Sequence, residues 1–96
     1  MANLVKSGWE LLLTLVSKTQ TPQELDQLLR LLLTLEEQQQ LAMRVQLINQ
    51  LLLNDKPQRE IAYDLQLSIA KVTRGSNALK VITDRLKKFL IKHLRE

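Results

Sequence analysis

The chain has 96 residues, of which 45% are hydrophobic, with no cysteine, one histidine and a formal net charge of +4. This length fits one small domain, and dimerisation would help such a chain to bury its apolar face. The composition excludes disulfides and thiolate metal sites, and a single histidine, His93, cannot build a multi-histidine metal cage. No apolar run approaches the ~20 residues that span a bilayer, and no signal-peptide core is recognisable, so we expect a cytoplasmic protein.

The sequence predicts an all-α fold, because glycine and proline are scarce and leucine is abundant. Thr21, Thr34 and Ser68 each precede an apolar periodic segment and are suited to cap a helix N-terminus. Asn54–Pro57 interrupts the periodicity and should break the chain between two helices. The expected helices run from about Asn3 to Gln20, from Pro22, from Leu35 to about Leu53, from Gln58 to Leu65, from Ile69, and from about Thr83 to Leu94.

Basic side chains are concentrated in the second half of the chain. Residues 1–54 carry four Lys or Arg against five Asp or Glu, whereas residues 55–96 carry ten against five. This asymmetry indicates a polyanionic partner, although solvated helices are often equally basic.

The segment from Gln58 to Leu79 has the pattern of a helix-turn-helix. Two short helices are joined by a tight turn, with Leu67 at the corner and the small Ala62 where the helices should cross. The second helix turns Ala70, Thr73 and Asn77 outward, and short side chains of this kind can approach base edges. The alternative is a pair of amphipathic helices packed in a bundle without a nucleic-acid partner.

The run Thr73–Lys80, with Gln58–Glu60 and Arg44–Val45 upstream of it, resembles the bacterial tryptophan repressor family. The similarity extends without a gap from about Trp9 to Lys80. It implies a six-helix intertwined homodimer with residues 1–54 as dimerisation core, 55–80 as helix-turn-helix head and 81–96 as C-terminal helix. It also implies a repressor that binds a palindromic operator of tryptophan biosynthesis or uptake genes, with L-tryptophan as corepressor and no cofactor.

The resemblance also implies a tryptophan site. Arg44 and Arg74 would enclose the indole ring beside Gly75, and Arg74 and Thr34 would bind the carboxylate. The ammonium group would meet the backbone carbonyls of Leu31 and Leu33 from the partner chain. Two further positions near the ligand depart from the family: Ala78 stands at a common serine position and Lys71 at a common threonine position.

Double-stranded operator DNA is the second partner that the resemblance implies. The expected DNA-binding residues are Gln58, Arg59, Ile69, Ala70, Lys71, Thr73, Arg74, Asn77 and Lys80. Two alternatives within this class are a relative that binds DNA without a ligand and one that responds to another amino acid or indole compound. An enzyme is not expected, because the sequence holds no nucleophile–base pair and no metal-ligand cluster.

Overall fold

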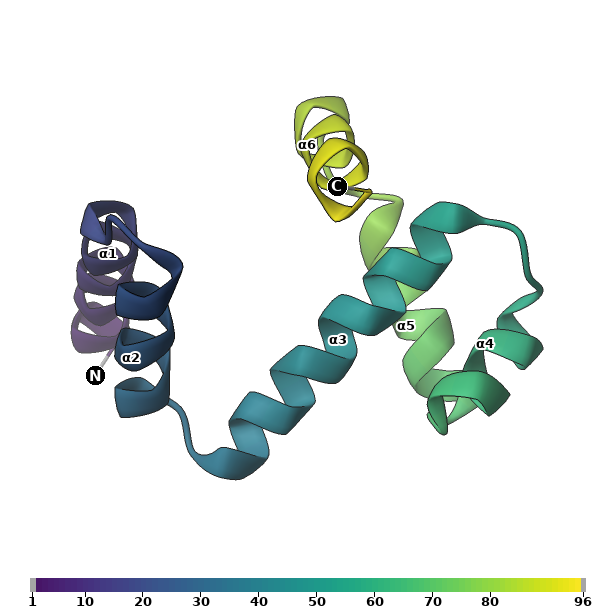
Figure 1. Ribbon diagram of the computed structural model, residues 1–96, viewed down its shortest axis with the longest axis horizontal. Helices are drawn as coiled ribbons and strands as arrows, with labels where there is room; N and C mark the ends of the chain where they lie inside the picture. The colour runs from purple at the N-terminus through teal and green to yellow at the C-terminus, as the bar shows by residue number, and fades with distance from the viewer. Residues whose placement is uncertain (1, 96) are drawn as a thin grey trace. The chain divides into compact units, whose positions relative to one another are not determined.

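The computed structural model describes residues 2–95, which form α-helices and no strand (Figure 1). The all-α prediction is confirmed, and the largest boundary difference is the end of the first helix, at Lys18 rather than Gln20. No helix among the described residues is long and apolar enough to cross a membrane. The helices are α1 Ala2–Lys18, α2 Pro22–Leu32, α3 Leu35–Leu53, α4 Gln58–Leu65, α5 Ile69–Leu79 and α6 Asp84–Leu94.

Hydroxyl side chains begin four of these helices, and three of them, Thr21, Thr34 and Ser68, were predicted as caps. At the start of α3, the Glu37 N–H donates to Thr34 Oγ1 (3.1 Å) and the Thr34 N–H donates back to Glu37 Oε1 (2.9 Å). This reciprocal pair satisfies two N–H groups that a helix start otherwise leaves without acceptors. Single bonds of 3.1 Å from a backbone N–H to a cap hydroxyl occur at Thr21 of α2, Ser68 of α5 and Thr83 of α6.

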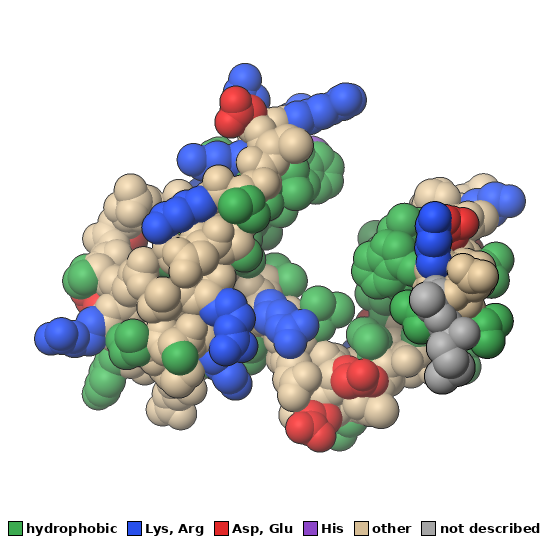
Figure 2. Space-filling view, turned by 180° about the vertical axis from the view of Figure 1, so that it is seen from behind, with side chains coloured by type: hydrophobic (Ala, Val, Ile, Leu, Met, Phe, Trp, Pro, Cys, Tyr) green, Lys and Arg blue, Asp and Glu red, His purple; other side chains and the backbone are tan. Residues whose placement is uncertain are grey.

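The chain divides into two compact units, residues 1–38 and residues 39–96. The first unit holds α1 and α2, and none of its described residues is fully buried. Trp9 of α1 is 61% exposed. Figure 2 shows hydrophobic side chains gathered on the surface of α1 and α2. This unit therefore presents apolar surface that it does not cover by itself.

The second unit contains the small core, where α3, α4 and α5 meet. Val72 of α5 and Ile61 of α4 are the largest fully buried side chains, and Leu47 of α3 and Ala62 of α4 join them. The predicted corner residue Leu67 packs against this cluster. Burying a side chain of this size stabilises the fold by about 1.5–3 kcal/mol, so these few contacts fix the angle between α4 and α5.

Two left-handed residues reverse the chain within the second unit. Asn54 (φ 53°) ends α3, and Gln66 (φ 54°) ends α4. The Gln66 N–H donates to carbonyls of the last turn of α4, which closes that helix and directs the chain into α5. A residue other than glycine in this region costs about 1–2 kcal/mol, and asparagine tolerates it better than glutamine.

Candidate functional site

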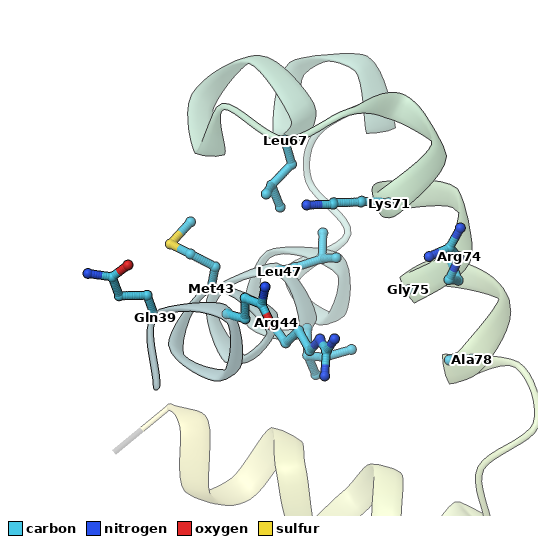
Figure 3. A pocket seen from close by; sticks show the side chains of 11 residues that line it. Gln39, Met43, Arg44, Leu47, Leu67, Lys71, Arg74, Gly75 and Ala78 are labelled. Atoms are coloured by element: carbon cyan, nitrogen blue, oxygen red, sulfur yellow. The ribbon is translucent and has the colours of Figure 1, made fainter. Parts of the chain in front are cut away.

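A cleft of about 620 Å³ lies between α3 and α5, within the second unit. Arg44 comes from α3, whereas Lys71, Arg74, Gly75 and Ala78 come from α5 (Figure 3). The structure therefore brings together all five of these predicted ligand residues. The volume is in the range of 300–1,000 Å³ that is usual for sites of small molecules.

The charge in this cleft is positive and its floor is apolar. Arg44, Lys71 and Arg74 contribute three cations, and no acidic residue is among the described residues that line it. The floor is formed by Met43, Leu47, Ile48 and Leu67. A flat apolar body with an anionic group suits such a lining, because guanidinium groups stack on rings and also bind carboxylates in a forked geometry.

Figure 3 shows Lys71 extending from α5 between Leu67 and Leu47, while the Arg74 side chain lies further along the same helix. The residues at 71, 74, 75 and 78 recur at three- and four-residue intervals and thus share one face of α5. Val72 lies on another face and is 0% exposed in the core. The core therefore fixes the rotation of α5 that turns its cationic face into the cleft.

Gly75 lies where α5 packs closely on α3. A Cβ atom at this position would lie 2.8 Å from Leu47 Cδ2 and 3.3 Å from Leu51 Cδ1. The sequence alone suggested another reason for this mid-helix glycine, the close approach of a flat ring. The structure gives the helix–helix contact as a sufficient reason, and the same contact leaves the cleft wall without a side chain.

Thr34, Leu31 and Leu33 belong to the first unit, so they form no part of the cleft of residues 39–96. Thr34 Oγ1 accepts from the Glu37 N–H, which leaves its own O–H proton able to donate to a carboxylate. The Leu33 carbonyl accepts a hydrogen bond from Gln38 Nε2 (3.1 Å), and a carbonyl oxygen has a second lone pair. These groups thus keep hydrogen-bonding capacity for a ligand.

All nine residues expected to contact DNA are exposed. The two helices that carry most of them share the buried cluster of Ile61, Ala62 and Val72, and Thr73 Oγ1 of α5 also donates to Gln58 Oε1 of α4 (3.4 Å). Ile69 is an exposed apolar residue, 50% accessible, at the start of α5. These nine residues lie at the beginning of α4 and along α5 and its C-terminal end.

The N-terminus of α4 keeps free N–H groups, because Pro57 occupies the cap position and supplies no side-chain hydrogen bond. Beside it, the Lys56 ammonium donates to the Asp64 carboxylate at 2.9 Å. This hydrogen bond, and then the charge of Asp64, raise the pKa of Lys56. An anion near this helix start would meet free N–H groups and the positive end of the helix dipole.

Sequence reasoning missed the part of the cleft that α3 provides apart from Arg44. Gln40, Met43, Leu47 and Ile48 all line the cleft, together with Gln39. These positions lie three or four residues from Arg44 or from one another, which places them on the same face of α3. That periodicity was the available signal for the α3 side of the cleft.

The chain is similar to known proteins along almost its whole length. The family model described as "Trp repressor protein" matches residues 7–94. Proteins named "Trp operon repressor homolog" from Chlamydia trachomatis serovars D, A and L2 are similar to this chain. Each is 44% identical over 94 residues, which cover 98% of this chain and 100% of the relative.

The family match covers most of the chain, including the cleft and both helices of the predicted helix-turn-helix. It confirms the predicted family and the prediction of a transcription regulator that is not an enzyme. The chain belongs to the Trp repressor family.

Proposed function

We propose that this protein is a cytoplasmic, homodimeric repressor that binds a palindromic operator when L-tryptophan occupies the cleft between α3 and α5. Its targets would be genes of tryptophan biosynthesis or uptake. One observation carries the proposal: α5 lines the cationic cleft with Lys71, Arg74 and Gly75, and the same helix is the second helix of the predicted helix-turn-helix, with its predicted DNA-binding residues exposed. A ligand in the cleft would therefore act directly on the DNA-reading element.

The ring of tryptophan would lie between the guanidinium groups of Arg44 and Arg74, over the apolar floor. Each cation–ring contact stabilises the complex by roughly 0.5–2 kcal/mol, depending on burial. The carboxylate would bind Arg74 of the same chain and Thr34 of the partner. Because the bound ring separates α5 from α3, tryptophan would favour the conformer that presents α5 to DNA, and it would do so by its differential affinity for that conformer.

The ammonium group would meet the carbonyls of Leu31 and Leu33 at the C-terminal end of α2 in the partner chain. Carbonyls at a helix end have no partner in the helix and carry the negative end of its dipole. Leu31 is 81% exposed, which supports an accessible helix end. Ala78 offers no hydroxyl to the ligand, so the amino group would depend on these carbonyls alone.

The homodimer would bury the apolar surface that each chain leaves open. In the first unit the large exposed apolar residues include Trp9 at 61%, Val5 at 74% and Leu35 at 68%. Exposed apolar surface of this extent is uncommon in a monomer and typical of interfaces. Residues 1–54 would form the dimerisation core, 55–80 the head and 81–96 the C-terminal helix.

DNA binding would use two kinds of contact. Arg59, Lys80 and the free N–H groups of α4 would bind backbone phosphates and set the register of the protein. Ile69, Ala70 and Thr73 would face base edges in the major groove, with Asn77 alongside, because their short side chains allow close approach. In a twofold dimer the two half-sites should lie about one helical turn apart, roughly 34 Å.

Selection of bound sequences from random duplex DNA, with and without L-tryptophan, tests this proposal. Recovery of a palindrome only with tryptophan is the expected result. Arg74→Ala should weaken tryptophan and DNA binding together, whereas Lys80→Ala should weaken DNA binding and leave calorimetric tryptophan binding unchanged. Absence of heat on tryptophan titration would overturn the corepressor assignment, and absence of any enriched sequence would overturn the repressor assignment.

A second candidate is a relative that responds to a different aromatic effector or needs none. Lys71 favours it, because a third cation in the cleft has no counterpart in the charges of zwitterionic tryptophan. The same selection with other amino acids and indole compounds in place of tryptophan separates the candidates. Enrichment without any ligand would identify a constitutive binder.

A further inference from the structure

A second cleft, of about 450 Å³, joins the helix-turn-helix to α6. Gln58 of α4 and Lys80 at the end of α5 line it, together with Lys56 before α4 and Lys87 of α6. Three lysines from three parts of the chain thus surround one cavity, and no acidic residue is among the described residues that line it. Gln58 and Lys80 also belong to the DNA-binding surface proposed above, so the cavity adjoins that surface.

The three lysines differ in the partners that their ammonium groups have within the chain. Lys56 donates to Asp64 at 2.9 Å, and Lys80 makes a long contact of 3.4 Å to Asn77 Oδ1. Among the described residues, no hydrogen bond or ion pair is formed by the Lys87 ammonium. Asn77 carries no charge, so Lys80 and Lys87 both keep a positive charge that no carboxylate neutralises, and among the described residues Lys87 has no hydrogen-bond partner to give up.

One hydrogen bond connects the end of α6 to α3, because Arg95, which follows the last residue of α6, donates to Asn49 Oδ1. Earlier in α6, Lys87 and Ile91, one helical turn apart, both line the cleft. The ammonium of Lys87 is thus carried by a helix that is anchored on the same unit as the helix-turn-helix.

We propose that this second cleft binds a backbone phosphate of the duplex and extends the DNA-binding surface onto α6 through Lys87. The inference rests on the proposed function, since it needs DNA seated on α4 and α5. A phosphodiester suits the cleft because its charge is negative and its oxygens accept from ammonium groups, from the Gln58 amide and from the Ser76 hydroxyl. Figure 2 shows Lys and Arg side chains gathered over α6 as well, so the potential around the cleft is positive.

The experiment measures affinity of the full chain for a 30-base-pair duplex of random sequence as a function of salt concentration. Random sequence is suitable because phosphate contacts do not depend on the bases. Lys87→Gln is compared with Lys92→Gln, which removes the same charge from the same helix but does not line the cleft. Lys87→Arg keeps the charge, and circular dichroism confirms that each variant is folded.

Because each protomer of the variant would bind one phosphate fewer, Lys87→Gln should make the slope of log K against log salt shallower by about 1.8, at about 0.9 for each phosphate. The affinity at 0.1 M salt should fall roughly tenfold or more by the same relation. Lys92→Gln should leave the slope unchanged, and Lys87→Arg should restore the steep slope. Equal slopes for Lys87→Gln and wild type would overturn the inference and leave the repressor assignment standing. Wild-type binding without salt dependence would overturn both.

Discussion

The close contact between α5 and α3 at Gly75 allows a test in which one chemical change has opposite effects at two positions. In Gly75→Ala the new methyl would lie 2.8 Å from Leu47 Cδ2, and Leu47 is only 5% exposed in the core. Alanine gains about 1 kcal/mol over glycine within a helix, whereas overpacking a core costs about 1–3 kcal/mol. Together these values give an expected net loss of up to about 2 kcal/mol in the free energy of unfolding.

Gly8 of α1 provides the control. A Cβ atom there would meet nothing within 4 Å, so Gly8→Ala should stabilise the protein by about 1 kcal/mol. Urea denaturation at one protomer concentration measures both variants, because the stability of a dimer depends on concentration. If Gly75→Ala raises the free energy of unfolding as much as Gly8→Ala does, the Leu47 side chain moves aside at no cost. The steric account of this glycine would then be wrong. If the steric account is right, Gly75→Ala and Leu47→Ala combined should cost less than the sum of the single changes.

Three further changes test the elements that position the cleft. Gln66→Gly should stabilise the protein by about 0.5–1 kcal/mol, because the left-handed backbone there costs glycine little; a loss of stability in urea would contradict this. Ser68→Ala should cost about 1 kcal/mol by removing the acceptor of the Lys71 N–H, and Ser68→Asp, which can still cap, should recover most of it. Val72→Ala should cost about 2 kcal/mol at a fully buried site, whereas Val81→Ala at an 84% exposed site should change stability by less than about 0.5 kcal/mol; equal losses would contradict the placement of the core.

Most helix boundaries could be predicted because the signals are local. The cap hydroxyls of Thr21, Thr34 and Ser68 each accept a hydrogen bond from an N–H three residues ahead, so nearby sequence is enough to identify them. The end of α1 was predicted two residues late, at Gln20, because no glycine or proline marks the point where the helix stops. The left-handed backbone of Gln66 could not be read from its residue type, because glutamine is not typical of such a turn.

The cleft could be predicted only in part, because it depends on how two distant helices pack. The resemblance identified Arg44 and Arg74, which are 30 positions apart and line the same cavity. It did not identify Met43 and Leu47, whose role depends on which face of α3 meets α5. The steric reason for Gly75 is likewise a distance between two helices, and no pattern within one helix contains it.

The faces of α5 also matter for anyone who wishes to redesign this protein. Positions 71, 74, 75 and 78 border the cleft, while positions 69, 70, 73 and 77 lie on a different face of the same eleven-residue helix and do not line the cleft. A randomised library restricted to the second set would vary the reading of DNA while the chemistry of the effector pocket stays constant. Operator preference and ligand response could then be evolved one at a time.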